Sequence, residues 1–95
     1  MRLISQDGMI DVPYEKVILG ICDQNNGQEY VIYAYHDSPR PLFIATYSNT
    51  DKALKVMEML REKYLEYCTA RTSEYWFAFN NPKVFKFPAD EEVEV

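Results

Sequence analysis

The sequence predicts an α+β fold, in which an antiparallel β-sheet meander packs on one long α-helix. Three observations lead to this prediction. Short runs rich in β-branched and aromatic residues, separated by turn residues, fill the first half of the 95-residue chain. A segment with helical apolar spacing follows, and a pair of aromatic runs comes after it. We therefore expect strands, then a helix, then a C-terminal aromatic hairpin.

Turn and proline signals delimit the strands of the first half. Asp7-Gly8 predicts a turn after a short first strand. Asn26-Gly27 is typical of a tight hairpin turn. The two prolines of segment 36–41 are incompatible with a central strand. Strands are therefore expected at residues 2–5, 17–22, 30–35 and 42–47, as an antiparallel meander within a single sheet.

The helix is the clearest element of the sequence. Ser48 is the expected N-cap, and Asp51 three positions later completes an approximate capping box. The charged residues of this segment fall on the side opposite the apolar stripe, which is typical of a solvated helix face. We expect the helix to end near Cys68 or Thr69. The positions with helical apolar spacing are Ala53, Met57, Leu60, Tyr64 and Cys68.

Two aromatic runs form the predicted C-terminal hairpin. Residues 75–79 and 83–87 would be its strands, and the Asn-Asn-Pro sequence at residues 80–82 would be its turn. Pro88 is expected to end the second strand. The hairpin would complete the α+β domain.

Acidic residues are concentrated at the end of the chain. The formal net charge is -5, and four of the acids lie in residues 90–95. We expect residues 1–89 to form one domain, since no linker or repeat divides them, and residues 90–95 to form a loose acidic tail. The near-neutral remainder lacks clustered Lys and Arg, which argues against binding of long nucleic acid.

The sequence shows no membrane or export signal. No apolar run approaches the roughly 18 residues that a spanning helix needs, and the first residues lack the apolar stretch of a signal peptide. We therefore expect no membrane partner. Cys22 and Cys68 are expected to be reduced and buried, as in cytosolic proteins.

Enzyme signatures are largely missing from the sequence. It contains no Gly-rich phosphate loop, no nucleophile elbow and no Cys or His pair at metal-ligand spacing. His36 lies in a proline-flanked segment, where an exposed turn residue is favoured over a catalytic one. We therefore expect a protein that is not an enzyme and that carries no cofactor or metal.

Two predicted strands carry apolar side chains on both faces. In residues 30–35 and 75–79, aromatic and aliphatic side chains alternate onto both sides of the strand. A single helix can cover one face of a sheet. Core packing accounts for part of this pattern, and a homodimer or higher homo-oligomer would account for the remainder.

Several aromatic residues lie close in sequence to cations and amides that could hold a flat anionic molecule. An aromatic ring can stack on a base, an amide can contact the edge of the base, and Arg or Lys can bind phosphate. Ordinary turn and surface roles are the alternative for each residue. The candidate ligand-binding residues are Tyr35, Trp76 and Phe77 for stacking, Asn80 and Asn81 for base edges, and Arg40, Arg71 and Lys83 for phosphate.

Three blocks of the chain resemble small proteins encoded by phages and prophages of Firmicutes. They are the opening MRLISxDGxxDxPYE, the segment from ATYS at residues 45–48 to MEMLRE at residues 57–62, and VFxFPxDE at residues 84–91. The arrangement is similar to the first-described Thoeris anti-defence family of phage proteins. Members of that family sequester cyclic ADP-ribose isomers made by bacterial TIR-domain defence enzymes, and some bind cyclic oligonucleotides as higher oligomers.

The resemblance implies a non-catalytic protein that binds a cyclic nucleotide signal in the host bacterial cytoplasm, in pockets between subunits. Many relatives carry a longer segment after the main helix, whereas here residues 69–74 alone separate the helix from the hairpin. The alternatives are an accessory structural role in the prophage and direct inhibition of a host defence protein. In the latter case the acidic tail and the charged helix face would imitate nucleic acid or occupy a basic groove.

Overall fold

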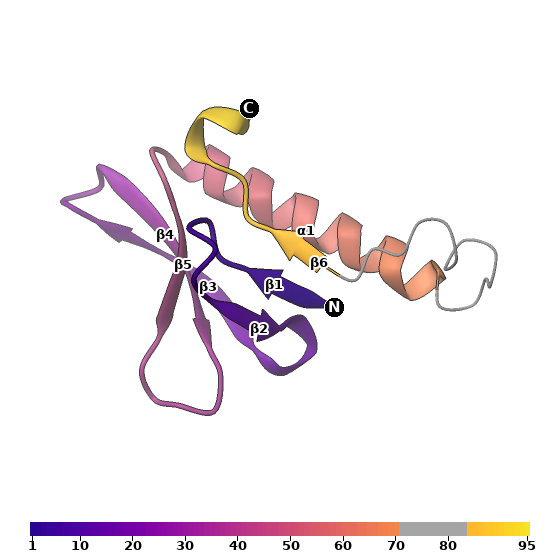
Figure 1. Cartoon of the computed structure of the whole chain (residues 1–95). Coiled ribbons are helices and arrows are strands. Elements are labelled where there is room, and N and C mark those ends of the chain that lie inside the picture. Colours follow the sequence, from indigo (N-terminus) through magenta and orange to yellow (C-terminus); the bar gives the residue numbers. More distant parts are fainter. Residues whose placement is uncertain (71–83) are drawn as a thin grey trace.

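The computed structural model describes residues 1–70 and 84–95 of the chain (Figure 1). The predicted α+β class is confirmed, because these ranges contain one α-helix and two three-stranded sheets. In chain order the elements are β1 (Arg2–Ile4), β2 (Asp11–Pro13), the 3-10 turn η1 (Tyr14–Lys16), β3 (Ile18–Gln24), β4 (Glu29–Tyr35), β5 (Leu42–Tyr47), α1 (Thr50–Ala70), β6 (Val84–Lys86) and the 3-10 turn η2 (Asp90–Glu92).

The strands form two sheets, not the single sheet that was expected. β3, β4 and β5 are consecutive antiparallel neighbours, which confirms the predicted meander for these three strands. β1 pairs with β2 in antiparallel and with β6 in parallel orientation. The expectation of one sheet is wrong because β1 and β2 pair with a strand from the far end of the chain and do not extend the meander.

The hairpin between β3 and β4 forms around the predicted Asn-Gly turn. Asn25, Asn26 and Gly27 have φ values of 52°, 57° and 83°. These are left-handed conformations, which Gly and Asn adopt more readily than other residues. This turn fixes the register of the antiparallel β3–β4 pair, which runs from Ile18 opposite Tyr35 to Gln24 opposite Glu29. Both strands are longer than the sequence predicted.

Helix α1 begins one residue later than expected. The Asn49 side-chain oxygen accepts a hydrogen bond from the backbone N–H of Lys52 at 2.8 Å, so Asn49 is the N-cap. The predicted capping box of Ser48 and Asp51 is wrong, because the Ser48 hydroxyl donates to a carboxylate outside the helix. The helix ends at Ala70, close to the predicted end.

The second strand of the expected aromatic hairpin is present as β6. Its partner among the described residues is β1, with Phe85 opposite Leu3. Phe85 and Phe87 are both buried, and their ring centroids lie 5.2 Å apart. Residues 75–79 and the turn at 80–82 lie outside the described residues, so the hairpin itself stays a prediction.

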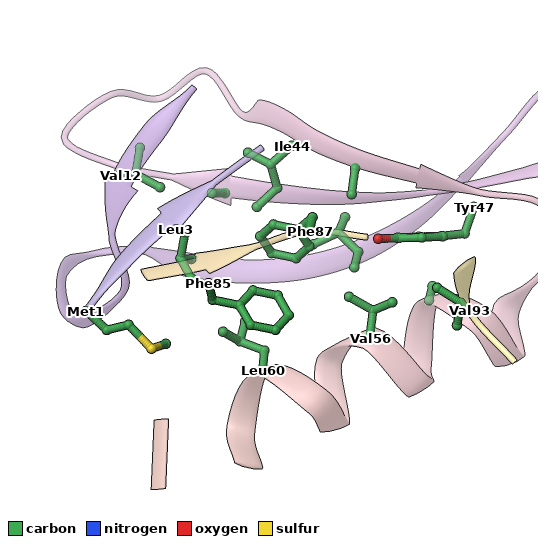
Figure 2. Close-up of a cluster of buried hydrophobic side chains, with 14 residues drawn as sticks. Met1, Leu3, Val12, Ile44, Tyr47, Val56, Leu60, Phe85, Phe87 and Val93 are labelled. Carbon is green, nitrogen blue, oxygen red and sulfur yellow. The ribbon is translucent and has the colours of Figure 1, made fainter. Parts of the chain in front are cut away.

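The core lies where α1 and both sheets meet. Figure 2 shows Val56 and Leu60 of α1 directed toward Phe85 and Phe87, with Ile44 on the opposite side. One side of the β3–β4–β5 sheet faces this core, and we call it the inner face. By strand register and packing its apolar residues are Leu19, Ile21, Tyr30, Ile32, Ala34, Leu42, Ile44, Ala45 and Tyr47.

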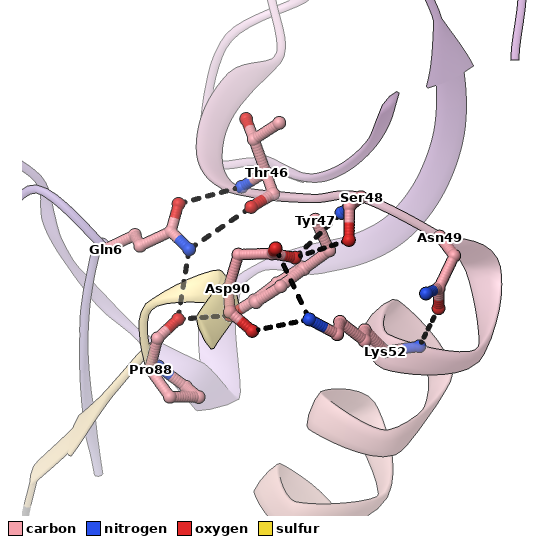
Figure 3. Close-up of polar contacts among 8 residues, drawn as sticks. All are labelled: Gln6, Thr46, Tyr47, Ser48, Asn49, Lys52, Pro88 and Asp90. Atoms are coloured by element: carbon pink, nitrogen blue, oxygen red, sulfur yellow. Dashed lines mark hydrogen bonds and ion pairs between the residues drawn. The ribbon is translucent and has the colours of Figure 1, made fainter. Parts of the chain in front are cut away.

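Residues 90–93 pack against the start of α1 (Figure 3). One carboxylate oxygen of Asp90 accepts hydrogen bonds from the Ser48 N–H at 2.8 Å and the Ser48 hydroxyl at 3.0 Å. The Lys52 ammonium donates to the Asp90 carbonyl at 2.9 Å and to the second carboxylate oxygen at 3.3 Å. Val93 is buried in the core. The expectation of a loose tail from residue 90 is therefore wrong for these residues.

Gln6 connects the two sheets (Figure 3). Its backbone N–H donates to the Ile44 carbonyl at 2.8 Å, and its side-chain amide exchanges hydrogen bonds with the Thr46 N–H at 3.0 Å and carbonyl at 3.2 Å. The same amide donates to the Pro88 carbonyl at 3.0 Å, to which the Tyr47 hydroxyl also donates at 2.8 Å. The free edge of β5 is thereby partly paired, and the C-terminal segment is held against it.

Candidate functional site

Two of the sequence-predicted ligand-binding residues lie in the described part of the chain. Tyr35 ends β4 and is 36% exposed, on the side of the sheet away from the core. Arg40 is exposed in the turn before β5, where its backbone N–H donates to the Ser38 hydroxyl at 3.2 Å. The predictions for Arg71, Trp76, Phe77, Asn80, Asn81 and Lys83 lie outside the described residues.

A pocket lies elsewhere, between η1, the start of β3 and the C-terminal half of α1. Its volume is about 410 Å³, within the range of roughly 300–1,000 Å³ that is typical of small-molecule sites. Four helix residues with i, i+3, i+4 and i+7 spacing form one wall. We call it the Tyr14–Tyr64 pocket, and it is lined by Tyr14, Glu15, Val17, Leu19, Met57, Leu60, Arg61 and Tyr64.

The chain reversal after β2 places Tyr14 and Glu15 at this pocket. Pro13 is extended, with φ -78° and ψ 127°, and the 3-10 turn η1 follows it directly. The Tyr14 N–H donates to the Met1 carbonyl at 2.9 Å. Both carboxylate oxygens of Glu15 accept hydrogen bonds from the Met1 ammonium at 2.9 Å. These contacts fasten η1 to β1, so the two pocket residues are held on a fixed element.

Aromatic rings form one side of the pocket. The centroids of Tyr14 and Tyr64 lie 4.6 Å apart with an interplanar angle of 44°, and Tyr67 continues the row at 6.0 Å from Tyr64. A hydrogen bond with the Cys68 thiol, followed by partial desolvation, raises the pKa of the Tyr64 hydroxyl. Like any tyrosine, Tyr64 is neutral at physiological pH and offers an uncharged ring for stacking.

Arg61 supplies the positive charge at the rim of the pocket. It is exposed, and no acidic residue in the described ranges forms an ion pair with it. Glu15 lies on the opposite element of the same rim. An aromatic wall, an apolar floor of Met57 and Leu60 and one available guanidinium suit a planar ligand that carries a phosphate or carboxylate.

A second hollow of about 480 Å³ lies along the exposed side of α1. It mixes acidic and basic side chains and contains no aromatic ring, which is typical of a solvated helix surface. Its lining residues are Asp51, Leu54, Lys55, Glu58, Arg61, Glu94 and Val95. The Tyr14–Tyr64 pocket is therefore the better candidate site.

Other kinds of site receive no support from the described residues. No group of three or more His, Cys, Asp or Glu in residues 1–70 and 84–95 is placed to hold a metal ion. Over the same ranges no helix is long and apolar enough to cross a membrane. Cys22 and Cys68 are free thiols, the first partly buried and the second exposed, so the expectation that both would be buried is wrong.

The chain gave no match to protein-family models, to curated proteins or to solved structures. The candidate site is therefore defined by the geometry of its own residues. Sequence reasoning missed the pocket because Tyr14 and Tyr64 lie far apart along the chain. Tyr64 was recognised as part of the apolar helix stripe, but no local pattern linked it to Tyr14.

Proposed function

We propose that the protein binds a cyclic nucleotide signal and sequesters it without cleaving it. The observation that carries this proposal is the Tyr14–Tyr64 pocket, where an aromatic wall stands beside the available cation of Arg61. Cyclic ADP-ribose isomers and cyclic oligonucleotides present the complementary groups, which are flat bases and phosphates.

Each group of such a ligand has a counterpart in the pocket. A purine ring can stack on the solvent-facing side of Tyr14 or Tyr64, and the Arg61 guanidinium can hold a phosphate through paired hydrogen bonds. Met57 and Leu60 add apolar surface for contact with the ring of the base.

The resemblance to phage anti-defence proteins supports sequestration rather than turnover. A protein of that kind would act in the bacterial cytoplasm, where it lowers the free concentration of the signal below the level that its effector requires. Sequestration at cellular concentrations needs a dissociation constant of about 1 µM or lower.

Isothermal titration with cyclic ADP-ribose isomers and with cyclic di- and trinucleotides tests the proposal. We expect saturable heat with at least one of them, and recovery of the intact ligand after the protein is denatured by heat. Recovery of hydrolysed product alone would contradict sequestration. A lack of heat with every ligand, together with stable capture of one host defence protein, would favour the direct-inhibitor alternative.

Substitutions inside and outside the Tyr14–Tyr64 pocket test whether it is the binding site. Arg61→Glu is expected to weaken binding by about a hundredfold or more, because a carboxylate would then face the phosphate. Tyr64→Ala should weaken it by about tenfold through loss of stacking. Lys55→Glu makes the same charge change on the same helix outside the pocket, and it should bind as the wild type does. If Arg40→Glu abolished binding while Arg61→Glu did not, the site would lie at the turn after β4.

A further inference from the structure

The β3–β4–β5 sheet has a second face, which is not part of the core. Directly opposed residues on neighbouring strands point to the same side of a sheet. The register places Ile18 opposite Tyr35 and Tyr33 opposite Phe43, and none of these four belongs to the cluster packed against α1. We call this side the outer face. Its apolar part consists of Ile18, Gly20, Cys22, Val31, Tyr33, Tyr35 and Phe43, of which Val31 is buried.

The centre of the outer face is already ordered within one chain. A Cβ atom at Gly20 would collide with the hydroxyl end of the Tyr33 ring, so this ring lies directly over the glycine backbone. The ring centroids of Tyr33 and Tyr35 are 5.6 Å apart at an angle of 84°, an edge-to-face contact. Ile18 is 72% exposed and Phe43 is 51% exposed. Because the Tyr33 and Tyr35 rings are already held in place within one chain, burying them in an interface loses little side-chain entropy.

We propose that the outer face is a homodimer interface, covered by the same face of a second copy of the chain. Contiguous exposed apolar surface of this kind marks association sites. The patch itself contains no charged side chain. Two copies with a net charge of -5 each can therefore meet through this patch without bringing like charges together.

Charges at the two ends of the outer face favour a two-fold arrangement. Glu29 begins β4 at one end, whereas Lys16 precedes β3 and Arg40 follows β4 at the other. Asp37, also at the second end, lies 3.8 Å from His36. If the two-fold axis lies between the stacked sheets and perpendicular to the strands, the strands of one copy run antiparallel to the strands of the other. The Glu29 end of one copy then faces the Lys16 end of the other.

The size of the outer face suits a reversible dimer. A strand spacing of about 4.8 Å and a rise of about 3.3 Å per residue give a three-stranded face of roughly 300 Å² in projection, and the relief of its side chains raises its accessible surface to on the order of 500 Å². A pair of such faces would bury about 1,000 Å², at the lower limit of specific interfaces. We therefore expect a dimer that dissociates in the micromolar range, with or without a nucleotide.

Size-exclusion chromatography with light scattering tests the interface on the full chain. The mass should rise from 11.2 kDa toward twice that value as the concentration increases. Ile18→Glu and Phe43→Lys should each weaken dimerisation by about a hundredfold or more, because the first places a carboxylate near the Glu29 end of the other copy and the second places an unpaired ammonium in the interface. Leu65→Lys on α1 is the matched control, because Leu65 is 65% exposed and lies outside the outer face. It should dimerise as the wild type does.

Three results would overturn the assignment. A wild-type chain that stays monomeric up to about 200 µM would remove the dimer. A dimer that survives both Ile18→Glu and Phe43→Lys would place the interface elsewhere, and so would one that Leu65→Lys disrupts equally. Unchanged circular dichroism of the variants shows that the monomer is folded. Nucleotide titration of the monomeric variants separates this proposal from the proposed function, because the Tyr14–Tyr64 pocket lies within one chain.

Discussion

The inner and outer faces of the β3–β4–β5 sheet carry similar side chains but differ in what covers them. On the inner face, Ile32 and Ala34 are fully buried against α1 and its neighbours. On the outer face, Tyr35 and Phe43 are exposed to solvent. Because strand side chains alternate between the faces, apolar residues on both sides predict a cover for each face. The fold supplies one cover, and we propose that self-association supplies the other.

The largest effect is expected from truncation on the inner face. Ile32→Ala should lower the free energy of unfolding by about 2–4 kcal/mol, because it leaves a cavity in a closed core. Phe43→Ala removes a larger side chain from the outer face, yet it should cost the monomer less than about 0.5 kcal/mol. Urea unfolding at about 1 µM protein, where the dimer is dissociated, measures both changes. A larger cost for Phe43→Ala would mean that the outer face is covered within one chain.

Alkaline pH provides a second contrast between the faces. Burial, followed by the nearby carboxylates of Asp90 and Glu92, raises the pKa of the Tyr47 hydroxyl on the inner face. The folded state therefore favours neutral tyrosine, whereas the unfolded chain ionises above about pH 10. The contribution of Tyr47 to stability is complete below pH 10 and should fall by about 1 kcal/mol per pH unit above it.

Tyr47→Phe isolates this contribution. The variant should be less stable at pH 7 by about 1 kcal/mol, because it loses the hydrogen bond to the Pro88 carbonyl. Its stability should then decline less steeply above pH 10 than that of the wild type. Tyr35→Phe, on the exposed outer face, is the control and should keep the wild-type slope. Equal slopes for all three proteins, from urea titrations between pH 8 and about pH 11, would contradict the assignment.

The class and the order of the elements could be predicted because their signals are local. Asn26 and Gly27 define a turn by their own backbone preferences, and the apolar positions of α1 repeat within a single segment. The N-cap was misassigned by one residue because Ser48 and Asn49 are both competent caps. The choice between them depends on Asp90, which lies far away in the sequence and engages Ser48.

The remaining errors concern contacts between distant segments. The parallel pairing of β1 with β6 joins the two ends of the chain, and no pattern within either strand specifies it. The candidate pocket likewise depends on contact between Tyr14 and Tyr64, which are brought together by η1 and α1. The outer face was partly predictable, because alternating apolar residues at 30–35 indicate two buried faces. Which side α1 covers is decided by tertiary packing.

Acid should weaken the contact between residues 90–93 and the start of α1. The backbone N–H of Ser48, followed by its hydroxyl and the Lys52 ammonium, holds the pKa of Asp90 below its usual value of 3.8. This contribution is complete above about pH 4 and is lost as the pH falls through the lowered pKa. Because the carboxylate is partly exposed, we expect a loss of about 1 kcal/mol.

Asp90→Asn tests this contribution of the Asp90 charge to the contact between residues 90–93 and the start of α1. The amide keeps the shape of the side chain but removes its charge, so the variant should be less stable by about 1 kcal/mol at pH 7. The difference from the wild type should shrink toward pH 2–3. Glu91→Gln, in the same turn but with an exposed side chain, is the matched control. Thermal unfolding across this pH range measures the stability of both variants. If Asp90→Asn and Glu91→Gln changed stability by the same amount at each pH, the role of Asp90 would be refuted.

The smallest effect on monomer stability is expected at the centre of the outer face. Gly20→Ala brings a methyl group against the Tyr33 ring, which can turn away because the Tyr33 side chain is only partly buried. The free energy of unfolding of the monomer should fall by less than about 1 kcal/mol. Dimerisation should weaken about tenfold, because the displaced Tyr33 ring no longer fits the interface.

In a Tyr33→Ala background the collision disappears, and the same Gly20→Ala change should stabilise the strand by about 0.5 kcal/mol. Urea unfolding of the four proteins of this double-mutant cycle measures the coupling. If Gly20→Ala had the same effect in both backgrounds, the Tyr33 ring would not lie over Gly20 in solution.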